Sequence, residues 1–144
     1  MTRYFKIAAL ALLAFLIGGR AIRIERTNPP VEGEIEAPPE IKAALRRACY
    51  DCHSNETVWP WYSDLAPISW LLAHDVSEGR EELNFSSWGK YADKRKAKKL
   101  KESAEEIAEG EMPPWYYEVM HPSASLSTTE RNALIEWAKQ GTKP

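Results

Sequence analysis

The stretch Cys49–His53, of sequence CYDCH, holds the residues of this chain that are best suited to do chemistry. Two thiols three positions apart, followed directly by an imidazole, form the attachment signature of a c-type haem. On a helical turn both thiols lie on one face and can reach the two vinyl groups on one edge of the porphyrin. The neutral imidazole of His53 can then bind the iron. The motif predicts one covalent haem c, with Cys49 and Cys52 as anchors and His53 as an axial ligand.

Three other interpretations of these residues stay open. A thioredoxin-like thiol pair needs its first cysteine at a helix N-terminus, where the dipole lowers the thiol pKa, whereas the helix expected here precedes the cysteines. A structural zinc site needs four ligands, drawn from the two cysteines and from His53, His74 or His121. A plain disulfide would leave His53 without a role. Haem is the favoured interpretation.

Two terminal helices should position the motif. Residues 40–52 carry apolar side chains at helical spacing, and the two thiols would lie at the C-terminal end of this helix. The last helix opens with Ser127 three positions before Glu130, a capping box, and can end at Gly141. Two further segments have helical periodicity: 67–77 and 93–109. The pattern predicts an all-α fold.

The N-terminal residues predict a membrane anchor. Arg3 and Lys6 precede an unbroken apolar run over residues 7–17, and Arg20 follows it. The run is shorter than the roughly 20 residues of a spanning helix, but its flanks can extend it if the basic side chains snorkel. We expect residues 1–26 to be an uncleaved transmembrane helix, although the run also fits the apolar region of a cleaved signal peptide.

The remaining chain divides into a linker and one small domain. Residues 27–39 hold two Pro-Pro pairs around an acidic stretch with little to bury, which predicts an extended spacer. Residues 40–144 form the expected c-type haem-binding domain. The chain has 19 basic and 21 acidic side chains, of which five basic ones and one acidic one precede residue 27. Residues 27–144 therefore hold 14 basic and 20 acidic side chains. So acidic a region is not built for nucleic acid.

Longer stretches resemble known proteins. A helix ending in CxxCH, a distant Met-Pro and a last helix containing ALIEWAK are similar to class I cytochromes c, in which the first and last helices cross. The matching contact here would join Leu45 to Leu134 and Trp137. Four segments more closely resemble the small, membrane-anchored bacterial haem-binding domain family: ACYDCHSNET (48–57), WPWYS (59–63), LNFS (83–86) and GEMPPW (110–115). The resemblance implies a single-haem, cytochrome c-like domain.

The same resemblance suggests a second axial ligand. In class I cytochromes c a methionine before a proline, at about this distance from the histidine, binds the iron. Met112, 59 residues after His53 and followed by Pro113, takes that place, and Met/His ligation would raise the reduction potential. Met112 could instead fill a gap in the core. His74, at the border of the apolar side of the 67–77 helix, is the alternative distal ligand.

Other residues are expected around the haem. Three aromatic side chains follow the motif closely: Trp59, Trp61 and Tyr62. They can shield the ring edge or donate hydrogen bonds to the propionates, although core packing explains them equally well. Arg80 is a further candidate for the propionates, because a guanidinium pairs well with a carboxylate. A backbone carbonyl of Pro60 or Pro67 is expected to accept a hydrogen bond from the free nitrogen of His53.

Two functions fit this pattern. If His53 and Met112 fill both axial positions, the protein is an electron carrier that serves a redox partner protein and is not an enzyme. If the sixth position is open or weak, the domain senses or reduces a small ligand such as O₂, NO or peroxide. We favour the carrier. Because covalent haem attachment belongs to export pathways, the expected location is a bacterial inner membrane, with the haem domain facing the periplasm.

Overall fold

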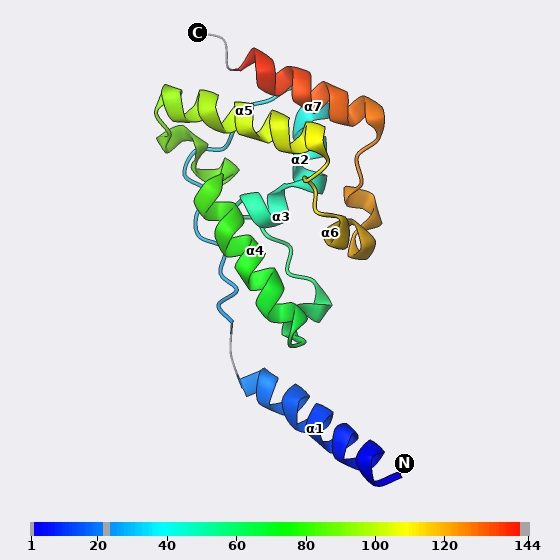
Figure 1. Ribbon diagram of the computed structural model, residues 1–144. Helices are drawn as coiled ribbons and strands as arrows, with labels where there is room; N and C mark the ends of the chain where they lie inside the picture. The colour runs from blue at the N-terminus through cyan, green and yellow to red at the C-terminus, as the bar shows by residue number, and fades with distance from the viewer. Residues whose placement is uncertain (1, 22–23, 142–144) are drawn as a thin grey trace.

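The computed structural model describes residues 2–21 and 24–141, and within them the chain is helical and has no strand (Figure 1). The α-helices are α1 (Thr2–Ala21), α2 (Pro39–Ala48), α3 (Tyr50–His53), α4 (Ile68–Glu82), α5 (Asp93–Glu109), α6 (Trp115–Met120) and α7 (Thr128–Gln140). Short 3₁₀ helices lie between them: η1 (Trp61–Asp64), η2 (Phe85–Lys90) and η3 (Pro122–Ala124). The prediction of an all-α fold is confirmed.

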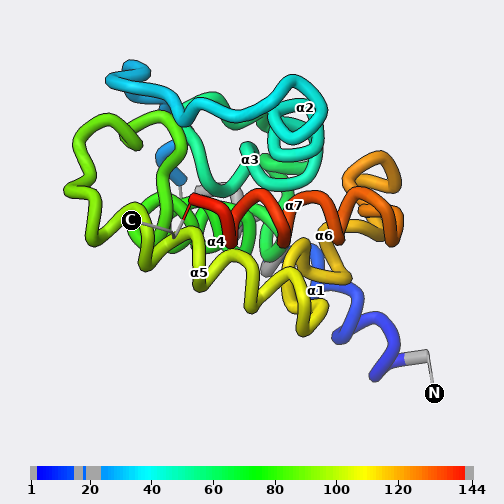
Figure 2. Tube along the Cα trace, turned by 90° about the horizontal axis from the view of Figure 1, so that it is seen from above, coloured from blue at the N-terminus to red at the C-terminus, as the bar shows by residue number. Residues whose placement is uncertain are grey.

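Helix α7 packs against both α5 and α2 (Figure 2). Its first turn contains the predicted capping box: the Ser127 hydroxyl accepts from the Glu130 backbone N–H at 3.2 Å, and the Glu130 carboxylate accepts from the Ser127 N–H at 2.9 Å. Leu134, only 1% exposed, lies in the same core cluster as Leu45 of α2. The expected packing of the domain's first helix on its last is therefore present.

The helix expected over residues 40–52 is in fact two helices. Cys49 separates α2 from α3, with φ −126° and ψ −31°. Its carbonyl accepts from the N–H groups of Cys52 and His53, at 3.2 and 2.9 Å, which closes the short turn of α3. Because the chain changes direction at Cys49, α3 packs on α4 while α2 stays on α7.

Residues 26–38 are extended and run along the domain; we call them the N-terminal strap. Ile35 is 2% exposed, and its N–H donates to the carbonyl of Phe85 at 3.0 Å. The Gly89 N–H donates to the carbonyl of Gly33 at 2.9 Å, and the Arg26 guanidinium pairs with a side chain of η1. A segment whose composition predicts a spacer is thus packed against the domain.

The expectation of an N-terminal transmembrane helix is wrong. Among the described residues no helix combines the length and the apolar character that crossing a membrane requires. In α1 the apolar run between Lys6 and Gly18 covers only about half of the roughly 20 residues that a span needs. The expected inner-membrane location and the membrane as a partner depended on this helix and are wrong as well. The periplasmic orientation was inferred from the motif, but it presupposed the same anchor and is withdrawn with it.

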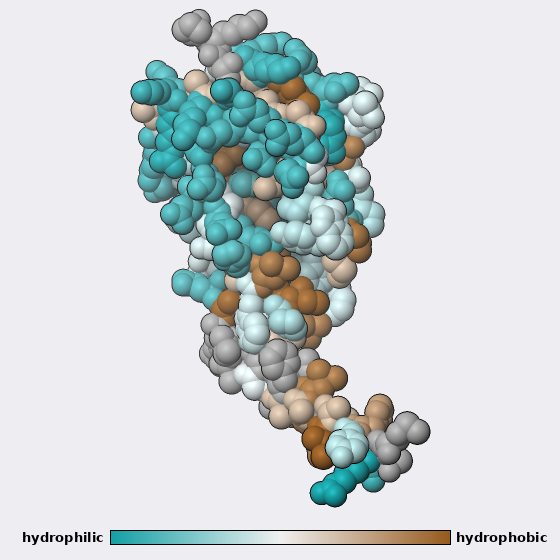
Figure 3. All heavy atoms as spheres, in the orientation of Figure 1, coloured by the Kyte–Doolittle hydropathy of each residue, from teal (hydrophilic) through white to brown (hydrophobic). Residues whose placement is uncertain are grey.

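The surface of the domain is mostly hydrophilic on the face shown in Figure 3. Apolar residues gather at the end formed by η1 and the start of α4, where Trp61 is 78% exposed and Ile68 45% exposed. The side chains of Cys49, Cys52 and His53 lie deeper, between the helices.

We predict that Ile35→Ala lowers the free energy of unfolding by about 2–4 kcal/mol, because truncating a fully buried isoleucine leaves a cavity. Denaturant-induced unfolding followed by circular dichroism would measure the change. Val31→Ala is the matched control, since Val31 lies in the same strap but is 48% exposed, and its effect should stay within about 0.5 kcal/mol. Equally small effects of both substitutions would contradict the packing of the strap.

Candidate haem site

The two thiols of the motif lie where two core clusters meet. Cys49 packs against the main cluster around Leu45 and Leu134, whereas Cys52 packs against a second cluster around Tyr62. Neither cysteine is in a disulfide. Burial raises the pKa of each thiol to about 12, and for Cys52 nearby carboxylates contribute as well. Both groups are therefore protonated at neutral pH, which disfavours a redox-active thiol pair.

The imidazole of His53 is held by the end of α4. Its Nδ1 lies 2.9 Å from the carbonyl oxygen of Gly79 and 3.1 Å from that of Leu83. Carbonyls only accept, so Nδ1 carries the hydrogen. Burial lowers the pKa of His53, which favours the neutral ring. The Nε2 lone pair is then the one available to a metal ion.

The expected orienting carbonyls, those of Pro60 and Pro67, are not the ones that His53 uses. The carbonyl of Gly79 belongs to the last turn of α4, and Leu83 is the residue that caps this helix. The Gly79 carbonyl also accepts from the Leu83 N–H at 2.9 Å, and its second lone pair is the one available to His53. The predicted helix ended at residue 77, before both carbonyls.

Gly79 also permits the close packing of α3 on α4. A Cβ atom at this position would lie 2.6 Å from the backbone oxygen of Cys52, well inside contact distance. Any larger residue would push the two helices apart and lengthen the bond from His53 to the Gly79 carbonyl. Sequence reasoning missed this glycine because nothing local distinguishes it from any other helical glycine.

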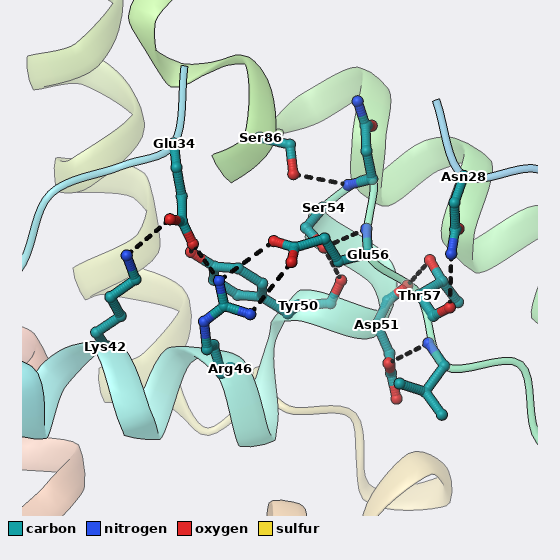
Figure 4. Close-up of polar contacts among 12 residues, drawn as sticks. Asn28, Glu34, Lys42, Arg46, Tyr50, Asp51, Ser54, Glu56, Thr57 and Ser86 are labelled. Carbon is teal, nitrogen blue, oxygen red and sulfur yellow. Dashed lines mark hydrogen bonds and ion pairs between the residues drawn. The ribbon is translucent and has the colours of Figure 1, made fainter. Parts of the chain in front are cut away.

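A ring-stacked and charged cluster supports the other side of His53. The ring of Phe85 meets the imidazole edge-on, with centroids 6.3 Å apart, and stacks on Tyr50 at 5.2 Å. The Tyr50 hydroxyl donates to Glu34 of the strap at 3.0 Å. Glu34 also forms ion pairs with Lys42 and Arg46, at 2.7 and 2.5 Å; Figure 4 shows both pairs. The strap is thereby tied to the motif by an acidic residue that the sequence did not single out.

The two candidates for the second axial ligand differ in their surroundings. The side chain of His74 is 61% exposed and lies 3.3 Å from Glu78, on the solvent side of α4. Met112 follows the left-handed Gly110 that ends α5, is partly buried, and packs on the same core cluster as Cys49. These surroundings favour Met112.

Of the aromatic residues predicted near the haem, Trp59 and Tyr62 belong to the cluster of Cys52, while Trp61 is 78% exposed. The Tyr62 hydroxyl lies 3.1 Å from Nε2 of His121. The indole Nε1 of Trp59 is buried and has no acceptor within the described part of the chain. A buried N–H without an acceptor is costly, and within the cluster that Cys52 also packs against it is suited to a carboxylate such as a haem propionate.

Helix α6 covers the same region through two tyrosines that the sequence did not indicate. The Tyr117 hydroxyl donates to Asp51 at 2.6 Å, and the Tyr116 hydroxyl donates to Asp75 at 3.2 Å. Burial, together with the bond to Asp51, raises the pKa of Tyr117, so its phenol stays protonated. Both carboxylates lie near Cys52, and α6 is thus fastened over the motif.

Arg80, predicted to bind a propionate, is engaged within the protein. Its guanidinium donates to Ser54, Thr57 and the first residues of the strap. Four of its five N–H groups are used in this way, which leaves one for an external carboxylate.

The residues present fit a haem. Two protonated, unpaired thiols, a neutral imidazole with Nε2 free and a buried indole N–H without an acceptor form one donor set. In the part of the chain that the structure covers, no group of three or more His, Cys, Asp or Glu residues is arranged to hold a metal ion. This observation speaks against the zinc interpretation.

Comparison with known proteins agrees with this assignment. Residues 9–140 match the model of a family described as the haem-binding domain. No curated protein and no solved structure shows significant similarity to the chain, so the resemblance to class I cytochromes c gains no support and no partner is identified. The family match spans nearly the whole sequence and includes every residue of the donor set. The chain belongs to the haem-binding domain family and is a haem protein.

Proposed function

We propose that the chain binds one haem covalently through Cys49 and Cys52, with Nε2 of His53 as an axial ligand, and that it transfers electrons. The observation that carries the proposal is the bond from His53 Nδ1 to the carbonyls of Gly79 and Leu83. It selects the tautomer in which Nε2 bears the lone pair, and it makes that nitrogen more basic, as second-shell acceptors of metal-bound histidines do.

The state of the thiols suits addition to a vinyl group. In that step the S–H adds across the C=C bond, so that an S–C bond forms and the hydrogen goes to the second carbon without any oxidant. Cys49 and Cys52 are unpaired, and burial keeps both protonated. Each cysteine packs against a different core cluster, which holds the two sulfurs in place.

Met112 is the second axial ligand in this proposal. Its thioether lies in the turn that follows α5, and the next residues are prolines, which have no backbone N–H to donate. A bound haem iron supplies one-electron redox chemistry, and histidine with methionine ligation raises its potential. Two filled axial positions leave electron transfer as the reaction that this site supports.

Trp59 orients the cofactor in the same proposal. Its buried indole N–H has no acceptor in the described residues and lies in the cluster of Cys52. A propionate oxygen would satisfy it by a charge-assisted hydrogen bond.

We predict that Cys49→Ser combined with Cys52→Ser abolishes haem staining on denaturing gels, because no S–C bond can then retain the haem. Each single variant should keep one bond and retain staining. Circular dichroism of all three variants should match the parent, since serine fits either site with little loss of volume. Haem that stays on the double variant after denaturation would disprove covalent attachment through these residues.

We predict that Met112→Ala removes the long-wavelength charge-transfer band of methionine-ligated ferric haem and lowers the reduction potential by roughly 0.1 V or more, within the ~0.8 V range that axial ligands span. It should also open the ferrous protein to rapid CO binding. Met120→Ala is the matched control, because Met120 lies at the end of α6 and is 48% exposed.

Rapid CO binding by the unmodified protein would contradict ligation by Met112. That result would favour the alternative in which an open sixth position receives a small ligand such as O₂, NO or peroxide.

A further inference from the structure

Arg80 is the residue that joins the motif, α4 and the N-terminal strap. Its Nε donates to the carbonyl of Ser54 at 2.7 Å, and its two terminal nitrogens donate to the Thr27 carbonyl at 2.8 Å and to Asn28 and Thr57 oxygens at 2.9 Å. All these acceptors are neutral. The guanidinium therefore acts here by its planar fork of donors, which lysine cannot reproduce.

The bonds of Arg80 and His53 form a reciprocal pair. The His53 side chain donates to the carbonyl of Gly79, which precedes Arg80, and the Arg80 side chain donates to the carbonyl of Ser54, which follows His53. Two adjacent residues on α4 thus exchange hydrogen bonds with two adjacent residues at the end of α3. Neither helix can slide along the other without breaking one of these bonds.

Asn28 of the strap adds hydrogen bonds to this pair of helices. The Asn28 amide accepts from Arg80 through Oδ1 and donates through Nδ2 to the Thr57 carbonyl at 2.9 Å. The Thr57 hydroxyl donates in turn to the carbonyl of Asp51, inside the motif, at 2.7 Å. Figure 4 shows Asn28, Thr57 and Asp51 following one another in this order.

We propose that Arg80 is a positioning residue for His53. By fixing the last turn of α4 against the peptide that follows the histidine, it keeps the Gly79 and Leu83 carbonyls on Nδ1 and so sets the direction of Nε2. Asn28 contributes through Arg80, and the strap therefore acts on the axial ligand from a distance. The consequence for the iron rests on the proposed function, whereas the effect on the imidazole does not.

The first test is nuclear magnetic resonance of the full chain without haem, with Arg80→Met as the variant. Long-range ¹H–¹⁵N spectra report the tautomer of His53. The parent should show Nδ1 protonated and Nε2 free, with slow exchange of the Nδ1 hydrogen. Arg80→Met should give a mixture of tautomers and exchange at least tenfold faster. Arg80→Lys should restore little of the parent behaviour, because one ammonium group cannot make the four bonds.

Arg131→Met is the matched control. Arg131 also joins two helices by donating a guanidinium N–H to a backbone carbonyl, that of Ile107 at the end of α5, which lies outside the motif. It should leave the His53 signals unchanged. Equal perturbation of His53 by both arginine variants, or an unaltered tautomer and exchange rate in Arg80→Met, would overturn the proposal.

Asn28→Ala keeps the test decisive if Arg80→Met does not fold. It removes one of the acceptors of Arg80 and the bond to Thr57, and should accelerate exchange of the Nδ1 hydrogen by an intermediate factor; an exchange rate equal to that of the parent would overturn the proposal.

Haem-loaded ferrous protein in the Met112→Ala background supplies the second readout, because the iron–imidazole stretch is observed when the sixth position is empty. The stretching frequency should fall when Arg80→Met is added, since Nδ1 loses its acceptors, and stay unchanged when Arg131→Met is added. A loaded ferrous Met112→Ala protein without any iron–imidazole band would refute the proposed ligation by His53, yet would leave the tautomer result intact. An identical band with and without Arg80→Met would overturn the role of Arg80 while leaving that ligation intact.

Discussion

The hydrogen bond from the His53 imidazole to the end of α4 is the interaction on which the site depends. Two carbonyls at the end of α4 accept from Nδ1: that of Gly79, which also accepts from the capping Leu83 N–H, and that of Leu83 itself. These two bonds restrict the imidazole, which could otherwise rotate, to one orientation and one tautomer. The absence of a side chain at Gly79, the break between α2 and α3, and the bonds of Arg80 all serve to bring the histidine within reach of these carbonyls.

Burial has opposite effects on the pKa values of the thiols and the imidazole, and both effects favour the neutral form. It raises the pKa of Cys49 and Cys52 to about 12 and lowers that of His53. A redox thiol pair needs a thiolate, for which this environment is unfavourable. A neutral imidazole is a metal ligand, and protonated thiols are the form that adds to a vinyl group. The low polarity thus argues against a redox pair, one of the interpretations that the spacing of the motif leaves open.

The parts that could be predicted from the sequence are those set by local patterns. The capping box of Ser127 and Glu130, the helix over 93–109 and the CxxCH motif each involve residues within a few positions of one another. The acceptors of His53 and the role of Arg80 depend on residues more than 20 positions away, which no local pattern reveals. The packing of the strap was not predicted because its prolines are typical of a linker, whereas Ile35, which is 2% exposed, belongs to the main core cluster. The anchor helix was overestimated because snorkelling was allowed to lengthen a short apolar run.

Trp59 carries the remaining argument for a carboxylate-bearing ligand. Leaving a buried N–H without an acceptor costs about 1–3 kcal/mol, a large fraction of the stability of a small domain. The described residues place no acceptor near Trp59 Nε1, although Tyr62, in the same cluster, has His121 as its partner. The cost is explained if the acceptor arrives with the cofactor, because a propionate would convert the unpaired donor into a charge-assisted bond. Trp59 and the Nε2 of His53 would then be satisfied by one ligand, so that haem binding and the stability of this part of the fold are thermodynamically linked.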